Sequence, residues 1–227
     1  YEIPLRLVGS EMCIRDSTMT PYQTTANSDQ SVFDQVYETL TVTQDDGTVA
    51  PCLAKTWTVS EDCLEYTFRL EEGVKFHNGE VMTADDVVYS FEQYIANPAK
   101  NNFVSMIEKV ETVDANTVKI TLNKVTPLFL VYTNELPILN KKFVEEHNGD
   151  ISEVACGTGP YKLTSIDLAT SAMLERNDDY RLTPAAIGKV ELRYIGDKST
   201  AAVQLETGDI DIMRMDPSQL ALSLIHI

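Results

Sequence analysis

The sequence is poor in cysteine, histidine and positive charge, and each shortage excludes a class of protein. Its four cysteines and three histidines show none of the CxxC or closely spaced His patterns of a zinc site. Eighteen Lys and Arg stand against 35 Asp and Glu, a net charge of −17. Nucleic-acid binding and docking on anionic lipid are therefore disfavoured, because both need clustered positive charge.

Long apolar runs and the familiar enzyme motifs are also missing. The longest apolar run, residues 128–132, is far too short to cross a bilayer. The chain contains no GxSxG elbow, no phosphate loop ending in Gly-Lys-Ser/Thr, no GxGxxG and no HExxH. We therefore expect no catalytic residue, no cofactor and no metal site, and a role in binding.

Two motifs could suggest a chemical site, and both favour a structural one. The Gly-Thr-Gly of residues 157–159 resembles a nucleotide-binding turn, but Pro160 removes a backbone donor where an anion would need it. His77 has no nucleophile near it in the sequence. We interpret the first as a rigid turn and the second as a turn histidine.

Two acidic pairs could suggest a metal site instead. Asp85 and Asp86 follow Thr83, where a helix N-terminus with its capping residue is the simpler explanation. Asp209 and Asp211 flank Ile210, and alternation along a strand directs Ile210 inward and both acids outward. Neither pair is predicted to bind a metal.

Apolar periodicity divides the chain into short elements without a repeat or a low-complexity linker. It predicts helices beginning near Ser28 or Asp29, at Thr83 and at Pro127, with others over 141–147 and 200–205. It predicts strands over 55–60, 64–70, 110–113, 117–122, 161–165, 171–175, 190–195 and 210–213. The last strand, helix and strand form a βαβ unit, which implies two parallel strands joined by a right-handed crossover.

A series of short sequence blocks runs in a fixed order along most of the chain. The blocks are VYE at 36–38, LA at 53–54 with Trp57, YTF at 66–68, GVKFHNG at 73–79, TADDVVYSF at 83–91, GTGPYK at 157–162, ERN at 175–177 with Tyr180, and ETGDID at 206–211. In order and wording they resemble the family 5 solute-binding proteins of peptide- and nickel-type ABC importers. The resemblance covers roughly residues 18–221 and implies capture of peptides, nickel complexes or related solutes outside the cell.

The two ends lie outside this resemblance. Residues 1–17 and 222–227 resemble translated sequencing-adapter read-through, and neither has the pattern of a secretion signal. Residues 1–17 also show no sustained alternation or helical period. We expect both ends to be non-native and structurally separable, although a genuine amphipathic terminus is the alternative.

The resemblance implies an α/β, two-lobed fold like that of periplasmic binding proteins, truncated here before the second lobe. Residues 18–40 and 151–221 are expected to form the first lobe, and residues 41–150 an α+β domain inserted into it. The core of this inserted domain is expected to include Trp57, Tyr66, Phe68, Phe76, Val88 and Phe91.

The resemblance also implies a function without catalysis: an extracytoplasmic solute-binding component that closes two lobes on a short peptide. A nickel-complex, sugar or opine receptor is the alternative within the family, and an α+β hydrolase or an acidic interaction module are alternatives from other classes. A monomer located in the periplasm or as a cell-surface lipoprotein, with ABC permease subunits as partners, is expected. The signal sequence is expected to be missing from this chain.

Two segments are candidates for the wall of the ligand cleft. The first is the polar loop with Thr24, Thr25 and Asn27, and the second follows the apolar helix and contains Tyr132, Asn134 and Glu135. Hydroxyl and amide groups there would suit a peptide main chain. A plain surface turn and ordinary loop packing are the respective alternatives.

Overall fold

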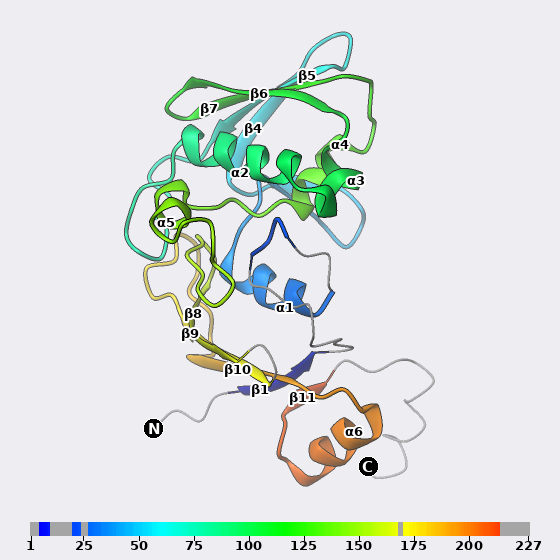
Figure 1. Cartoon of the computed structure of the whole chain (residues 1–227), viewed down its shortest axis with the longest axis vertical. Coiled ribbons are helices and arrows are strands. Elements are labelled where there is room, and N and C mark those ends of the chain that lie inside the picture. The colour runs from blue at the N-terminus through cyan, green and yellow to red at the C-terminus, as the bar shows by residue number, and fades with distance from the viewer. Residues whose placement is uncertain (1–4, 10–19, 24–26, 168–169, 214–227) are drawn as a thin grey trace.

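The two larger β-sheets of the described chain lie at opposite ends of an elongated molecule (Figure 1). The computed structural model describes residues 5–9, 20–23, 27–167 and 170–213. Helix α1 (Asn27–Val36) lies between the sheets, and its apolar residues Val32, Phe33 and Val36 are buried. A short hairpin of β2 (Thr41–Thr43) and β3 (Val49–Pro51) follows it.

The first sheet is antiparallel, with the strand order β4-β5-β7-β6. Its strands are β4 (Ala54–Val59), β5 (Glu65–Leu70), β6 (Ile107–Asp114) and β7 (Thr117–Leu122). Alternation directs Tyr66, Phe68 and Leu70 into the core. Trp57 and Val88 are only half-buried and pack against that core. The prediction that they lie inside the core is therefore wrong, because they lie at its edge.

Helix α2 (Ala84–Ala96) covers this sheet, and Asp86 fixes its start as the sequence predicts. The Asp86 carboxylate accepts hydrogen bonds from the backbone nitrogen and the hydroxyl of Thr83, at 2.9 and 3.1 Å. It also accepts one from the backbone nitrogen of Lys141 at 3.0 Å. Asp86 therefore holds α5 (Lys141–Glu146) against α2.

Four short helical segments complete this end of the molecule. They are η2 (Pro98–Lys100), α3 (Asn101–Val104), α4 (Phe129–Tyr132) and η3 (Thr133–Glu135). All of these elements lie within residues 41–150, the segment predicted as an inserted domain. The boundaries of that domain stay a prediction.

The second sheet has the order β11-β1-β10-β9-β8. Its members are β1 (Leu5–Gly9), β8 (Tyr161–Asp167), β9 (Ser171–Arg176), β10 (Lys189–Tyr194) and β11 (Ile212–Met213). Helix α6 (Lys198–Thr207) connects β10 to β11. Both strands run parallel to β1, which lies between them, so the predicted parallel βαβ unit is present with one strand inserted.

Strand β1 overturns the expectation that residues 1–17 are structurally separable. Residues 5–9 pair with β10 and β11, and the Arg6 side chain binds the Asp211 carboxylate at 3.3 Å. The alternation of Leu5 and Leu7 around Arg6 is interrupted by Val8 and is too short to be recognised as periodic. The read-through origin of residues 1–17 stays a prediction, and residues 222–227, like Cys13, lie outside the described residues.

The turn that leads into β8, residues 157–161, packs directly on the end of α1. The Gly159 nitrogen donates to the Val36 oxygen at 2.9 Å, and a Cβ added to Gly157 would lie 2.0 Å from that same oxygen. Tyr161 is buried beneath the turn and donates its hydroxyl proton to the Ile187 carbonyl. This turn is structural because only glycine permits such a close backbone approach.

Hydrogen bonds from His77 connect the same turn to the part of the molecule that contains the four-stranded sheet. Its Nε2 lies 3.0 Å from the Gly159 oxygen, and its Nδ1 accepts from the Gly157 nitrogen at 3.4 Å. A backbone bond from His77 to the Gly157 oxygen accompanies them. Because one ring nitrogen donates and the other accepts, the neutral imidazole fits this position, and burial lowers the His77 pKa to about 4.

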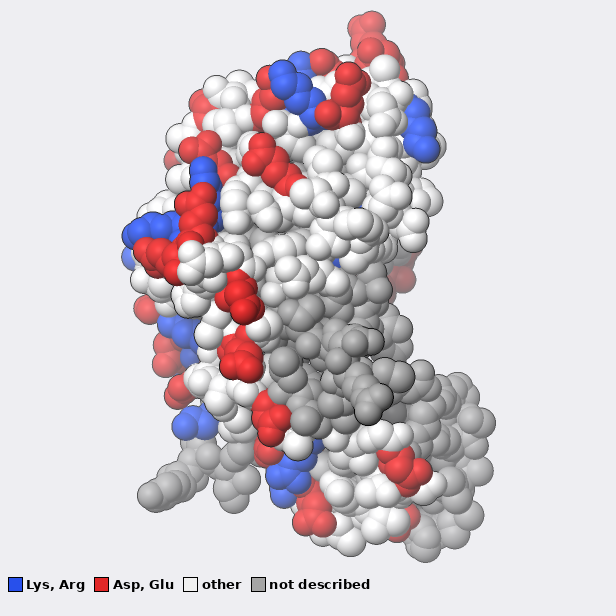
Figure 2. Space-filling view, viewed as in Figure 1, with Lys and Arg blue, Asp and Glu red and all other residues white. Residues whose placement is uncertain are grey.

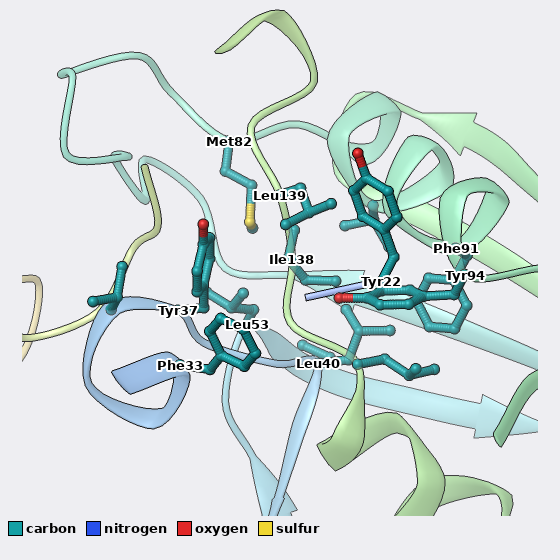
Figure 3. Packing of buried hydrophobic residues seen from close by; sticks show 14 of the residues in the cluster. Tyr22, Phe33, Tyr37, Leu40, Leu53, Met82, Phe91, Tyr94, Ile138 and Leu139 are labelled. Atoms are coloured by element: carbon teal, nitrogen blue, oxygen red, sulfur yellow. The ribbon is translucent and has the colours of Figure 1, made fainter. Parts of the chain in front are cut away.

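One continuous buried cluster joins α1 to α2 (Figure 3). Phe33, Tyr37 and Leu40 meet Tyr94 of α2 through the extended segment that carries Ile138. The Tyr94 hydroxyl donates to the Pro137 carbonyl at 2.8 Å.

Within the described ranges, no helix is long and apolar enough to span a membrane.

Candidate functional site

A cavity of about 440 Å³ opens where α1, the β2–β3 hairpin, η3 and the loop after β9 meet. This volume is within the range of small-molecule sites. The residues that line it are Gln30, Asp34, Tyr37, Glu38, Thr39, Val42, Cys52, Asn134, Glu135, Pro160 and Tyr180. Segments far apart in the sequence therefore form one concave surface, which we call the α1 cavity.

Glu38 is the most heavily bonded of these residues. Its carboxylate accepts hydrogen bonds from the Tyr180 hydroxyl at 3.0 Å and from Nη2 of Arg181 at 2.8 Å. Nε of Arg181 lies 3.4 Å from the second carboxylate oxygen. The Glu38 side chain is 7% exposed and that of Arg181 21%, so this is a largely buried ion pair. Removing one member of such a pair leaves an uncompensated charge.

Cys52 contacts both members of this ion pair. Its thiol donates to Oε1 of Glu38 at 3.7 Å, and Nη2 of Arg181 donates to the Cys52 carbonyl at 3.4 Å. Burial, followed by the charge of Glu38, raises the pKa of the Cys52 thiol to about 11. The thiol is therefore protonated at neutral pH and acts as a weak hydrogen-bond donor, not as a nucleophile.

The structure brings two of the predicted site residues to the cavity and leaves a third beside it. Asn134 and Glu135 line the α1 cavity. Tyr132 lies just before them and packs edge-on against Phe103, with 5.9 Å between ring centroids. The buried hydroxyl of Thr133, 2.7 Å from that of Thr41, fixes η3 against β2.

The other predicted segment is only partly described. Thr24 and Thr25 lie outside the described residues, and the backbone of Asn27 begins α1. The predicted role of this loop in a ligand site stays a prediction.

Sequence reasoning missed the polar residues on the floor of the cavity. Glu38 and Tyr180 belong to blocks that we used only to establish the family resemblance, and Arg181 and Cys52 belong to none. Glu38 itself could have indicated such a site. A glutamate that directly follows the apolar Val36 and Tyr37 is expected to be partly buried and then requires a polar partner. The identity of that partner, 143 residues away, could not be read from the sequence.

The acidic pairs have the structural roles predicted for them. Asp86 caps α2, and Asp85 accepts a hydrogen bond from the Thr112 hydroxyl. Ile210 is buried, whereas Asp209 and Asp211 are exposed, but these residues precede β11, so the predicted strand alternation at this position is wrong. Figure 2 shows carboxylates spread over one face of the molecule among fewer Lys and Arg side chains.

Comparison with known proteins places this geometry in a family. The sequence model of bacterial extracellular solute-binding proteins, family 5 Middle, matches residues 48–224. A nickel-binding periplasmic protein of Escherichia coli K12 is 34% identical over 202 residues, which is 86% of this chain and 37% of that protein. A probable D,D-dipeptide-binding periplasmic protein, DdpA, of the same strain is 30% identical and covers 86% of this chain and 40% of its own length.

Solved structures agree on the fold. NikZ from Campylobacter jejuni, in complex with Ni(L-His), superposes with a TM-score of 0.85 at 28% identity, covering 96% of this chain and 44% of that one. The periplasmic binding protein DppA from Helicobacter pylori, in complex with the peptide STSA, gives 0.80 at 29% identity, covering 91% and 45%. This chain thus spans less than half the length of these relatives.

The ordered sequence blocks, the mixed α/β fold and the family match agree. The chain belongs to the family 5 bacterial extracellular solute-binding proteins, a family of substrate-binding transport proteins.

Proposed function

We propose that this chain is part of the extracytoplasmic solute-binding component of an ABC importer and that its solute is a short peptide. The observation that carries the proposal is the α1 cavity, whose amide, carboxylate and hydroxyl groups lie at the boundary between the two sheets. Family membership and a relative solved with a bound peptide support it.

In this proposal the α1 cavity is one wall of a cleft that closes by hinge motion on the solute. Asn134 and Glu135 contribute polar groups to the wall, and Thr24, Thr25, Asn27 and Tyr132 extend it. Residues 18–40 and 151–221 form the first lobe around an inserted domain, residues 41–150. The protein is not an enzyme, because a binding role needs no catalytic residue and no cofactor.

The proposal includes a place in the cell and a set of partners. The protein acts in the periplasm or as a cell-surface lipoprotein, as a monomer that delivers its solute to ABC permease subunits for transmembrane transport. The periplasmic relatives support the first part.

Native mass spectrometry of the complete gene product, purified from cells grown in peptide-rich medium, tests the proposal. A peptide that co-purifies and is released on denaturation supports it. Truncating Asn134 to Ala should then weaken affinity for that peptide about tenfold, since a lost hydrogen bond costs about 1.4 kcal/mol. Asn116→Ala, in the β6–β7 turn, is the matched control. A gene product that binds no peptide contradicts the proposal.

A nickel complex is the second candidate, favoured by the 34% identity to a nickel-binding protein. Titration with nickel and L-histidine, alone and together, separates the two candidates. Saturable binding of the mixture without peptide binding would favour the nickel complex. Sugar or opine solutes, an α+β hydrolase and an acidic interaction module remain the further alternatives to a peptide receptor.

A further inference from the structure

The residues that line the α1 cavity carry charge of one sign. Asp34, Glu38 and Glu135 contribute carboxylates, and none of the lining residues that the structure describes is Lys, Arg or His. The rest of the wall is neutral, with amides, hydroxyls and the apolar surfaces of Tyr37, Val42 and Pro160. The charged groups of the wall itself are therefore acidic, and the Arg181 guanidinium lies against one of them, Glu38.

The three carboxylates differ in how far the protein neutralises them. Glu38 is paired with Arg181 at 2.8 Å, so it contributes little net charge. The Lys100 ammonium is close enough to Glu135 to interact electrostatically, but the two form no ion pair within 4.0 Å in the part of the chain that the structure describes. Lys100 is buried, with its ammonium 5.9 Å from the centre of the Phe103 ring. Glu135 is therefore only partly compensated.

Asp34 is the carboxylate that the protein leaves uncompensated. Its oxygen accepts a hydrogen bond from the Gln30 amide at 2.7 Å, and this amide is neutral. No described Lys or Arg forms an ion pair with it. Its side chain is exposed to solvent, and desolvation by the surrounding residues raises the Asp34 pKa, the direction expected for a carboxylate without a cation beside it.

We propose that the α1 cavity is a cation-selecting subsite, in which Asp34 and Glu135 receive the amine or guanidinium of the bound solute. The solute class is then a peptide that carries a Lys or Arg side chain. Its aliphatic stem would pack on the apolar surfaces of Tyr37, Val42 and Pro160, as long basic side chains do. This inference rests on the proposed function, because it assigns a charge preference to the same wall.

Calorimetry of the complete gene product with three matched tripeptides tests the inference. Ala-Lys-Ala should bind roughly fivefold or more tightly than Ala-norleucine-Ala, its uncharged analogue of similar shape, and Ala-Glu-Ala most weakly. The preference for lysine should shrink in high salt. Equal affinity for the lysine and norleucine peptides overturns the inference and leaves the proposed function standing.

Charge-neutralising variants test whether the preference for the lysine peptide arises from the α1 cavity. Asp34→Asn and Glu135→Gln should each reduce the ratio of lysine to norleucine affinity. Glu61→Gln changes the net charge equally at an exposed turn between β4 and β5 and should leave the ratio unchanged. If all three variants behave alike, overall charge and not the cavity produces the preference, and the subsite is overturned.

A second probe keeps the inference testable if no peptide binds, which would contradict the proposed function. The backbone amides of Asp34 and Glu135 are followed by NMR during titration of the 227-residue chain with n-butylammonium chloride or 1-butanol. Saturable shifts with the ammonium and none with the alcohol support the subsite. Identical responses to the two probes overturn it.

Discussion

The two larger sheets of this molecule are built from similar alternating strands, but they differ in how completely one face is covered. In the four-stranded sheet, Phe68, Val118 and Ile120 are each 0% exposed beneath α2 and the short helices. In the five-stranded sheet, Ile212 is 50% exposed. A cavity of about 450 Å³ there is lined largely by apolar side chains, with Leu7 and Leu192 among them.

The difference shows how burial depends on connectivity. The four-stranded sheet is made from neighbouring hairpins, and the helix that covers it lies between β5 and β6 in the sequence. In the five-stranded sheet, β1 pairs with β10 across 185 positions, as Leu5 does with Val190. We therefore expect the four-stranded end to tolerate little change in its core and the five-stranded end to respond weakly.

The largest expected effect is in the covered sheet. Phe68→Ala should lower the free energy of unfolding by about 3–5 kcal/mol, because it leaves a cavity in a packed core. Chemical denaturation followed by circular dichroism measures the loss. Trp57→Ala, at the half-buried edge of the same sheet, is the comparison and should cost clearly less. Equal losses would show that the edge is as well packed as the interior.

Lowering the pH should reduce the stability of the folded protein through His77, which bonds to the turn at residues 157–159. Burial lowers its folded pKa to about 4, below the unfolded value near 6.5, so the unfolded chain binds the proton more readily. The stabilisation is complete above pH 6.5 and declines as the pH falls toward 4, by about 3 kcal/mol in all. Denaturation midpoints measured between pH 7 and 4 should show this decline.

His77→Gln is the variant that isolates this contribution. It should be less stable at pH 7 and should lose less stability on acidification than the parent does. His147→Gln is the matched control, since His147 follows the end of α5 and its ring bonds to the Phe143 carbonyl four residues before it. A parent and a His77 variant with parallel pH profiles would mean that the turn does not hold a neutral imidazole.

Glu38 also joins segments from both ends, and its loss should have an intermediate effect. Glu38→Gln removes the charge that Arg181 needs, so we expect a loss of about 2 kcal/mol, below that of a fully buried pair because Arg181 is partly exposed. Thermal denaturation of this variant beside Glu61→Gln measures it. Similar melting of the two variants would mean that the ion pair is not structurally important.

The smallest effect should come from strand β1. Leu7 is half-buried against the core, so Leu7→Ala should cost about 1 kcal/mol or less. Urea denaturation of this variant and of Phe68→Ala, under the same conditions, compares the two sheets directly. A loss as large as that of Phe68→Ala would show that β1 is as important to stability as the covered core.

Local chemistry made much of the fold predictable from the sequence. The cap at Asp86, the turn at residues 157–159 and the buried stripe of α1 all depend on residues close together in the chain, and the structure contains each of them. The second role of Asp86, as acceptor for the Lys141 nitrogen, was not predictable because it joins distant segments.

The α1 cavity and strand β1 were less predictable for the same reason. Glu38 meets Tyr180 and Arg181 across more than 140 residues, and neither partner can be identified by spacing. Strand β1 has no sustained apolar alternation, so its place in the sheet follows from pairing with β10 and β11. Asn134 and Glu135 were identified only through the family resemblance.

The most direct test of the central claim is a crystal structure of the complete gene product with the solute that co-purifies with it. The claim is that the α1 cavity forms part of the solute-binding wall. We expect solute atoms within hydrogen-bond distance of Asn134 or Glu135, with Glu38 still paired to Arg181. A solute that is bound elsewhere and contacts no residue of the α1 cavity would contradict the claim.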